Sequence, residues 1–504
     1  MPLNQPLPYR LSFLAAGGRL VFLFLLFFSG SALCQHPDAL LDPRDMKEDL
    51  TWLKGKILHY HPACLDSLRA DSVGLAFDGG AYEAENFMHE LQFLKLVRKT
   101  LISLRCGHTS AIPSPDFYQY YKRARPKPLF PLQVYANEDD LVVRFNGSSD
   151  SSIAIGDKLL SINQEPCADI ARSIMEFLPG DGYHSSFKKF HLSLNFPTYY
   201  LFHKGPSYAY EAGVLDSAGR YSSHVFSLRG TGKGVSKPFP ERSVRILFSD
   251  DFRALGVLSS NPRVAWLKIY GFGGRTSWYE KTFRKIKEMG FQHLILDLRG
   301  NSGGHLFNAN TLLTYLVADT FSFRFERADK KIKLDGRSNM NLAMRWTMKV
   351  FSWLPKQGKR FGPSCDKTGN LLVNRFLFRP VKRNHYDGKL VVLMDGGTFS
   401  ASSLVAAKLR KKRQTQLVGD ESGGGANGSN AMLMPTLQLP KTKIRVTLPL
   451  YRIRHETNGL PGRGLIPDLY LLPDLVKKVK GIDTELEYLG RNLIWFEKAA
   501  GENP

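Results

Sequence analysis

The sequence is poor in cysteine, in acidic residues and in long hydrophobic runs. Five cysteines among 504 residues do not make a disulfide scaffold, and none of their spacings resembles a zinc site. The composition excludes a polytopic membrane protein, and the N-terminal apolar run, residues 20–28, is far shorter than the roughly 20 residues that span a bilayer, which disfavours a permanent transmembrane anchor. The chain has 46 acidic residues but 69 Lys and Arg, so its formal charge is +23. This charge favours binding to acidic surfaces such as phospholipid, lipopolysaccharide or nucleic acid.

Apolar and aromatic residues, by contrast, are plentiful. They make up 43% and 12% of the chain, enough for large cores, which excludes a disordered chain, a collagen and a coiled coil. At roughly 150 residues per domain, the length predicts about three domains. Composition therefore predicts a basic multidomain globular protein, and local motifs must indicate its function.

The first motif is a targeting signal at the N-terminus. Arg10 and Arg19 precede the apolar run without any acidic residue, and small residues follow it up to Cys34. This pattern predicts a secretory signal peptide over 1–34 and an exported protein, periplasmic or associated with the cell envelope, with secretion as an alternative. Cleavage after Cys34 is favoured over lipidation of Cys34, because bulky Leu33 fits a lipidation site poorly. Four cysteines then remain, and both buried thiols and one disulfide stay open: Cys64, Cys106, Cys167 and Cys365.

The region after the signal, 35–126, is predicted to be helical, with helices over 44–58 and 82–104 and a linker over 116–128. The next region, 127–235, reads as β-rich. Strands over 130–135, 141–145 and 155–163, followed by a helix over 169–177, resemble a PDZ domain, a family that captures peptide ends by strand addition. A plain β-rich insert is the alternative, because no Gly-rich carboxylate-binding loop is present.

Strands and helices alternate from residue 240 to 472. Apolar strands are predicted over 264–270, 293–298, 390–394 and 415–418, helices over 278–289, 307–317 and 400–412, and further β structure over 441–450. Buried strands that alternate with helices predict a mixed α/β core with a parallel-rich sheet covered on both faces. The tail, 473–504, is predicted to be helical.

Three Gly-rich connections follow strands of this core: 297–304, 395–403 and 419–428. Ligand sites in open α/β sheets lie at the carboxyl ends of strands, so these connections are the candidate site. The G-x-G-x-x-G spacing of Gly423, Gly425 and Gly428 does not indicate dinucleotide binding, because no helix follows it.

A second motif interpretation stays open. Residues 300–304 match G-x-S-x-G between a strand and a helix, as in an α/β-hydrolase. Ser302 would then be the nucleophile of an esterase, paired with His455 and with Asp387 or Asp420.

Four motifs in order carry a more specific resemblance. Leu-Arg-Gly-Asn-Ser-Gly-Gly at 298–304, Gly-Gly-Thr-Phe-Ser-Ala at 396–401, Val-Gly-Asp-Glu-Ser-Gly-Gly-Gly at 418–425 and Gly-Leu-Ile-Pro-Asp at 464–468 resemble the tail-specific, or C-terminal-processing, serine peptidases of family S41. The resemblance implies an α/β catalytic core over 240–472 with an inserted PDZ-like domain, a protein or peptide substrate, and no cofactor or metal. It makes Ser400 the nucleophile.

The departures from the family pattern select a branch. The processing branch carries a lysine base about 25 residues after the serine, but here Gly423-Gly-Gly425 stands there, and Ser403 replaces a frequent glutamate. The tricorn-like branch has a Ser–His–Glu arrangement instead. Its histidine maps onto His108, although Cys106 replaces the usual aspartate before Gly107, and its glutamate maps onto Glu456, 56 residues after Ser400.

These residue types fit the implied roles. An imidazole accepts the proton of the serine hydroxyl and later protonates the leaving amine, while a carboxylate fixes its tautomer. The oxyanion donors are expected to be Ala401 and an amide of Gly303 or Gly304. Each role has a structural alternative: Ser400 as a helix N-cap, His108 as a hydrogen-bonded loop histidine, and Glu456 in a surface ion pair.

The leading hypothesis is thus an exported serine endopeptidase acting through an acyl-enzyme. The basic run at 408–413 is interpreted as a solvated helix end, so no nucleic acid is expected, whereas peripheral contact with an acidic membrane surface fits the charge. The rival is a catalytically inactive S41-fold protein that binds a peptide or apolar ligand, as the retinoid-binding relative in the retina does. The oligomeric state is left open.

Overall fold

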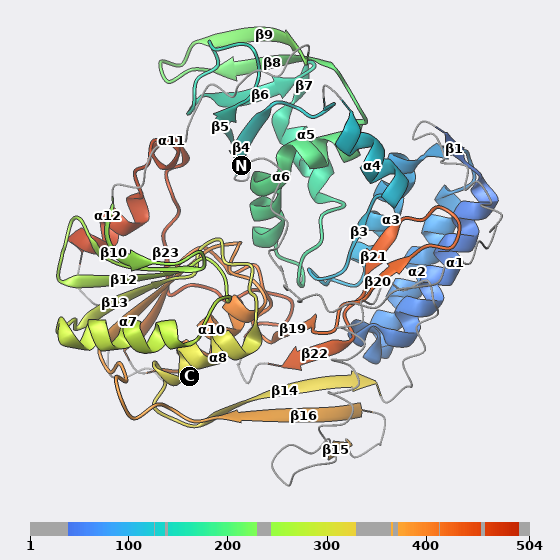
Figure 1. Cartoon of the computed structure of the whole chain (residues 1–504). Coiled ribbons are helices and arrows are strands. Elements are labelled where there is room, and N and C mark those ends of the chain that lie inside the picture. Colours follow the sequence, from blue (N-terminus) through green and yellow to red (C-terminus); the bar gives the residue numbers. More distant parts are fainter. Residues whose placement is uncertain are drawn as a thin grey trace, which may run out of the picture. The chain divides into compact units, whose positions relative to one another are not determined.

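The computed structural model describes residues 39–124, 127–136, 140–228, 243–328, 364–365, 371–412, 414–454 and 459–492. The predicted signal peptide, His455 and Glu456 lie outside this part of the chain. Within it the predicted mixed α/β fold is confirmed: helices alternate with strands of five sheets (Figure 1).

The N-terminal region is helical, as predicted, but its boundaries differ. The first predicted helix corresponds to α1 (Pro43–Tyr60), which continues through η1 (Pro62–Leu65) into an unpredicted α2 (Ser67–Glu83). The predicted helix over 82–104 begins only with α3 (Glu90–Ile102), because β2 (Met88–His89) pairs with β1 (Leu40–Leu41) and the Gln92 side chain accepts from the His89 amide to cap α3.

The predicted linker over 116–128 was wrong for its first half. Residues Pro115–Arg123 form helix α4, because Ser114 accepts a hydrogen bond from the Phe117 amide and proline occupies the first turn. Between α3 and α4, β3 (Ser110–Ile112) pairs with β21 (Arg445–Thr447), and β21 pairs with β20 (Thr436–Gln438). This three-stranded sheet joins the N-terminal region to the end of the α/β core.

The β-rich region is a sheet in the order β4-β5-β6-β8-β9, with β7 beside β6. All its pairings are antiparallel. Helix α5 precedes a long helix α6, which is kinked at Asn195, two residues before Pro197. The bounds are β4 Leu132–Ala136, β5 Leu141–Asn146, β6 Lys158–Ile162, β7 Glu165–Pro166, α5 Cys167–Met175, α6 Ser186–Lys204, β8 Ala209–Leu215 and β9 Tyr221–Ser227.

The core sheet has seven strands in the order β10-β11-β12-β13-β17-β18-β23. The first three are antiparallel neighbours, and the pairs from β12 to β23 are parallel. The bounds are β10 Val244–Ser249, β11 Arg253–Leu258, β12 Val264–Ile269, β13 His293–Asp297, β17 Lys389–Met394, β18 Thr415–Gly419 and β23 Leu469–Tyr470, with helices α7 Ser277–Glu288, α8 Leu306–Thr314 and α10 Ala401–Leu409 between strands.

Both faces of this sheet are covered, because successive side chains of a strand point to opposite faces. On β13, Leu294 and Leu296 belong to the large core cluster that also holds Phe283 of α7. Ile295 belongs to a second cluster with Leu486 of α12 (Thr484–Arg491). In Figure 1, α7 and α8 accordingly lie along one face of the sheet and α12 on the other.

A five-stranded sheet in the order β15-β16-β14-β22-β19 packs beside the core. Its strand β19 (Gly428–Ala431) lies at the edge of the sheet and pairs with β22 (Tyr451–Arg454). The other strands are β14 Phe321–Ala328, β15 Ser364–Cys365 and β16 Leu371–Phe378, and the short helix α11 (Leu475–Val479) precedes α12.

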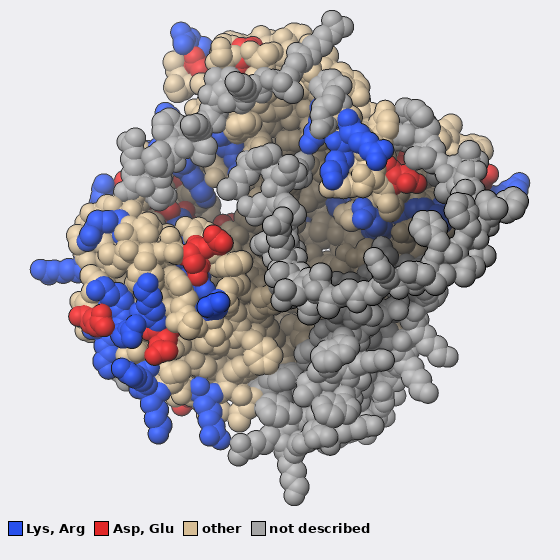
Figure 2. Space-filling model, in the orientation of Figure 1, with Lys and Arg blue, Asp and Glu red and all other residues tan. Residues whose placement is uncertain are grey.

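The surface reflects the basic composition. Lys281, Arg284 and Lys287 are exposed on α7, and Figure 2 shows lysine and arginine side chains gathered over this part of the molecule. Across the described ranges, no helix combines the length and apolarity that crossing a membrane requires. Of the two options left open for cysteine, Cys64, Cys106 and Cys167 are free thiols.

Candidate active site

Two Gly-rich connections meet at the carboxyl end of the core sheet. They follow β13 and β17, adjacent parallel strands on which Asp297 lies opposite Leu393. The Thr398 hydroxyl donates to the Leu298 carbonyl at 3.0 Å, and the Phe399 amide donates to the Asn301 carbonyl at 3.1 Å. Because the two strands are in register and the loops are hydrogen-bonded to each other, residues 298–304 lie against residues 396–401.

Ser400 stands at the turn from β17 into α10 in a strained conformation. Its φ of 57° and ψ of −122° are unusual for a residue with a side chain, and such backbone costs of the order of 1–3 kcal/mol. It occupies the N-cap position, but its side chain makes no capping hydrogen bond. The Ser400 hydroxyl therefore does not cap helix α10.

That hydroxyl meets His108. The distance from His108 Nε2 to Ser400 Oγ is 3.0 Å, across 292 positions of sequence. The His108 ring also contacts the Phe399 ring, with centroids 4.5 Å apart. Burial lowers the pKa of His108 from 6.5 to about 4, so the imidazole is neutral at pH 7, the form that accepts a proton.

Gly107 permits this approach. A Cβ atom on Gly107 would lie 2.7 Å from the Phe399 ring, and Phe399 itself stacks on Phe187 with centroids 4.0 Å apart. The aromatic pair forms an apolar wall against the imidazole. Because Phe399 directly precedes Ser400, this packing sets the position of the histidine relative to the hydroxyl.

Asp181 joins the histidine loop (residues 103–109, between α3 and β3) to the third Gly-rich connection, 419–428. It lies between α5 and α6, and its carboxylate accepts the Gly107 amide at 2.7 Å and the Gly425 amide at 3.3 Å. It is 5% exposed, and burial raises its pKa from 3.8 to about 6. Sequence reasoning missed Asp181, since an isolated aspartate before a glycine carries no local signal.

The glycines of the third connection serve close packing. A Cβ on Gly423 would lie 2.0 Å from the Gly396 carbonyl oxygen, and one on Gly424 would lie 2.2 Å from Ser403 Oγ. The Ser403 hydroxyl donates to the Ser400 carbonyl at 2.8 Å. This connection therefore packs against the turn at Ser400, which agrees with the expectation that its glycines do not bind a dinucleotide.

Two of the three predicted oxyanion residues, Gly303 and Ala401, lie together at this turn, whereas Gly304 packs against the Phe272 backbone. A Cβ on Gly303 (φ 111°) would lie 2.9 Å from Ser400 Cβ and 3.2 Å from the Ala401 nitrogen. The Gly303 amide, however, already donates to Asn301 Oδ1 at 2.9 Å. Within the described chain, the amides of Gly304 and Ala401 donate to no protein acceptor.

The esterase alternative finds less support in the geometry. Ser302 is exposed, and Asp387 precedes β17, at the opposite end of that strand from the Gly-rich connections. Asp387 pairs with His385 Nδ1 at 2.8 Å instead. Asp420 follows β18 at the expected end, but its carboxylate accepts the Glu421 amide at 2.7 Å.

Comparison with known proteins agrees with this architecture. Residues 263–471 match the model of peptidase family S41. A carboxy-terminal-processing protease of Bartonella bacilliformis is 33% identical over 97 residues, which cover 19% of this chain and about a fifth (21%) of that relative. Residues 263–471 are a family S41 peptidase domain.

Solved structures extend the likeness beyond the S41 domain. The crystal structure of mature CPAF is 14% identical and has a TM-score of 0.62, with 90% of this chain and 97% of that chain covered. A mutant of CPAF is 13% identical with a TM-score of 0.64, covering 92% and 99%. At such identities the likeness concerns the fold, which this chain shares from its N-terminal helices through the S41 domain.

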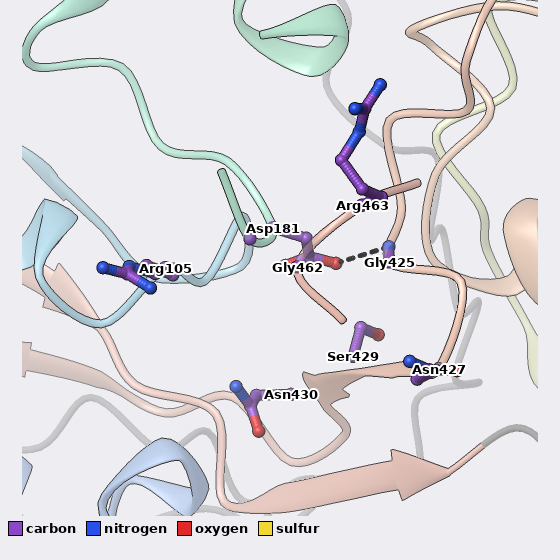
Figure 3. Close-up of a pocket in the computed structure, with 10 residues that line it drawn as sticks. Arg105, Asp181, Gly425, Asn427, Ser429, Asn430, Gly462 and Arg463 are labelled. Carbon is purple, nitrogen blue, oxygen red and sulfur yellow. Dashed lines mark hydrogen bonds between the residues drawn. The ribbon is translucent and has the colours of Figure 1, made fainter. Parts of the chain in front are cut away.

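A polar pocket lies where Asp181 meets the S41 domain. Its lining comes from the histidine loop, the Asp181 loop, β19 and the segment before β23: Arg105, Asp181, Gly182, Gly425, Asn427, Gly428, Ser429, Asn430, Gly462 and Arg463. In Figure 3 the guanidinium groups of Arg105 and Arg463 point away from the pocket. Arg105 stacks on Tyr183 at 3.4 Å, and Arg463 pairs with Glu421 at 2.6 Å.

Proposed function

We propose that this chain is an exported serine endopeptidase that cleaves peptide bonds through an acyl-enzyme. The observation that carries the proposal is the contact of 3.0 Å between His108 Nε2 and Ser400 Oγ, made by two loops of separate regions. A serine hydroxyl becomes a nucleophile when an adjacent base removes its proton. The neutral imidazole, the strained turn and the missing N-cap bond all support this role for Ser400.

In the first step, Ser400 Oγ attacks the carbonyl carbon of the scissile peptide and His108 Nε2 takes the hydroxyl proton. The tetrahedral oxyanion receives hydrogen bonds from the Ala401 and Gly304 amides, each worth about 3 kcal/mol in the transition state. Gly303 contributes close approach instead of a donor, since its amide is bonded to Asn301. His108 then gives the proton to the leaving amine, and water repeats the sequence to release the acid.

We assign Glu456 as the carboxylate that orients His108. His108 Nδ1 is buried and has no hydrogen-bond partner among the residues that the structure describes. A protonated Nδ1 needs an acceptor if the imidazole is to keep Nε2 free as the base. Glu456 lies two residues beyond the end of β22, whose neighbour β19 lines the pocket next to the histidine loop.

The export signal over 1–34 and a peptide-presenting role for the PDZ-like region, 127–235, belong to the same proposal. Asp181, which comes from that region, holds the histidine loop. A substrate that moves the region would thus act directly on the position of His108.

A fluorophosphonate probe tests the proposal, because it labels only an activated serine. The wild-type chain and the matched control Ser302→Ala are expected to be labelled, Ser400→Ala to lose the label, and Glu456→Gln to be labelled at least tenfold more slowly. Peptide release from casein, followed by mass spectrometry, should show the same order.

Two results would contradict the proposal. Folded wild-type protein that is never labelled would favour a binding protein, and loss of labelling in Ser302→Ala alone would favour the esterase.

A further inference from the structure

The fold brings three potential metal ligands together beside Ser400. Atoms of Cys106, His108 and Asp181 lie within 4.8 Å of one another, and Cys106 and Asp181 are buried. Tetrahedral zinc at about 2.0–2.3 Å from its ligands separates them by about 3.5 Å, so side-chain shifts of about 1 Å close the cluster. Sequence spacing did not indicate this site, because Asp181 is 73 residues distant from His108.

The hydrogen bonding of the cluster leaves room for a cation. His108 Nε2 is bonded to Ser400, whereas Nδ1 is buried without a partner in the described ranges. Asp181 accepts two backbone amides and has no cationic partner among the described side chains. Buried carboxylates are usually paired with a cation or bound to a metal. An unpaired carboxylate and an unpaired imidazole nitrogen thus lie beside a thiol.

The residues around the cluster leave a path for a metal ion and direct no positive charge toward it. Of the three ligands, Asp181 lines the polar pocket together with Asn427, Ser429 and Asn430 (Figure 3), so the pocket gives access to the cluster at Asp181. Both arginines of the lining are directed elsewhere, toward Tyr183 and Glu421. A fourth, water ligand has space in the pocket, as open zinc sites require.

We propose that Cys106, His108 and Asp181 form an inhibitory site for zinc or a similar divalent transition metal. Metal on Nδ1 leaves the single ring proton on Nε2, which then donates to Ser400 instead of accepting from it. It also displaces the orienting carboxylate from Nδ1. Bound metal therefore holds the histidine in the wrong tautomer. This inhibitory consequence rests on the proposed peptidase function, whereas metal binding itself does not.

The thiol also faces the pocket side of the cluster. Cys106 donates to the Asn430 carbonyl at 3.8 Å, and Asn430 is one of the residues that line the pocket.

Cobalt binding tests the site without any activity assay. The full chain, purified metal-free, is titrated with Co²⁺ while the thiolate-to-cobalt charge-transfer band and the visible bands are recorded. One Co²⁺ per chain with a charge-transfer band, displaced by Zn²⁺, is expected for the wild type. Cys106→Ser should lose that band, and Cys167→Ser, which removes another buried thiol, should keep it. A wild type without the band, or an undiminished band in Cys106→Ser, overturns the site.

Two further measurements complete the test. If Cys106→Ser does not fold, Asp181→Asn takes its place and should weaken Co²⁺ binding at least tenfold while keeping the charge-transfer band; unchanged affinity overturns the site. In the fluorophosphonate assay, Zn²⁺ should block labelling of the wild type, a chelator should restore it, and full labelling with zinc bound overturns the inhibitory role. Absence of labelling in metal-free protein refutes the proposed function alone, because the cobalt spectrum decides the site separately.

Discussion

Replacing Arg299 with methionine is expected to destabilise the protein more than any loss of a surface ion pair. Arg299 follows β13, and its guanidinium makes five hydrogen bonds of 2.6–3.1 Å to Asp297, Asp483 and Glu485. Its side chain is 9% exposed, and those of the three carboxylates are 1%, 13% and 2% exposed. This cluster fastens the start of α12 to the Gly-rich connection that carries Gly303.

The magnitude follows from what the substitution leaves behind. Asp297 keeps Lys268 at 2.9 Å, but Asp483 and Glu485 lose their arginine partner while staying buried. Removing one member of a buried ion pair costs about 3–5 kcal/mol, because a charge is left without compensation. We therefore expect the free energy of unfolding to fall by about 3–5 kcal/mol at pH 7.

The loss has a defined pH dependence. Burial raises the pKa of Asp483, but Arg299 outweighs it and holds that pKa below the ordinary value of 3.8. A carboxylate with a lowered folded-state pKa stabilises the fold above its unfolded pKa, and this stabilisation is lost as pH falls through the folded pKa. Glu485 behaves differently, because burial raises its pKa above 4.5 even with Arg299 present, so its carboxylate is protonated at a higher pH than that of Asp483. The difference between the wild type and Arg299→Met should therefore be largest at neutral pH and should shrink as the pH falls through the acidic range.

The assay is urea unfolding followed by tryptophan fluorescence, with Ser400→Ala in both chains to prevent self-cleavage. Arg172→Met is the matched control: Arg172 pairs with Asp169 at 2.7 Å, but these side chains are 72% and 53% exposed. Exposed pairs contribute about 0–1 kcal/mol. If Arg299→Met were no more destabilising than Arg172→Met, the cluster would contribute nothing beyond a surface pair and the reasoning would be wrong.

Three further outcomes are expected. Burial lowers the pKa of His108 to about 4 and raises that of Asp181 to about 6, so kcat/KM for peptide hydrolysis in chelator-treated buffer should fall about tenfold through pH 6 and again near pH 4. Asp181→Asn should lack the step near pH 6, and a step that persists in this variant would contradict the assignment. Gly303→Ala should reduce fluorophosphonate labelling at least a hundredfold, since its Cβ would lie 2.9 Å from Ser400 Cβ, whereas Gly290→Ala, also at positive φ but with nothing within 4 Å, should label normally. Asp181→Asn should lower kcat about tenfold with little change in KM, because the asparagine side chain has one acceptor oxygen and cannot accept from both Gly107 and Gly425. Asp169 is exposed and serves as the control; an equal loss of kcat in Asp169→Asn would contradict the role given to the Asp181 hydrogen bonds.

Local patterns in the sequence predicted most of the α/β core. The apolar runs at 293–298 and 390–394 are strands β13 and β17, and the helix expected at 278–289 is α7 (Ser277–Glu288). Such segments are buried on both faces, so their composition alone indicates their structure. The long helix over 82–104 and the linker over 116–128 were wrong because caps and a short strand pairing, not periodicity, decide where α3 and α4 begin.

By itself, the sequence indicated which loops form the candidate site: glycines that tolerate positive φ follow buried strands, and Ser400 precedes a helix. The family resemblance predicted His108 as the base for Ser400, and the tertiary structure brings the two side chains to 3.0 Å across 292 positions. Tertiary structure alone decided that the Gly303 amide is occupied by Asn301 and that Asp181 and Cys106 lie against the same imidazole. The physical reason is that periodicity and turn chemistry act over a few residues. Contacts between loops depend instead on how the N-terminal sheet strand β3 pairs with β21 and on how tightly Gly107 packs against Phe399.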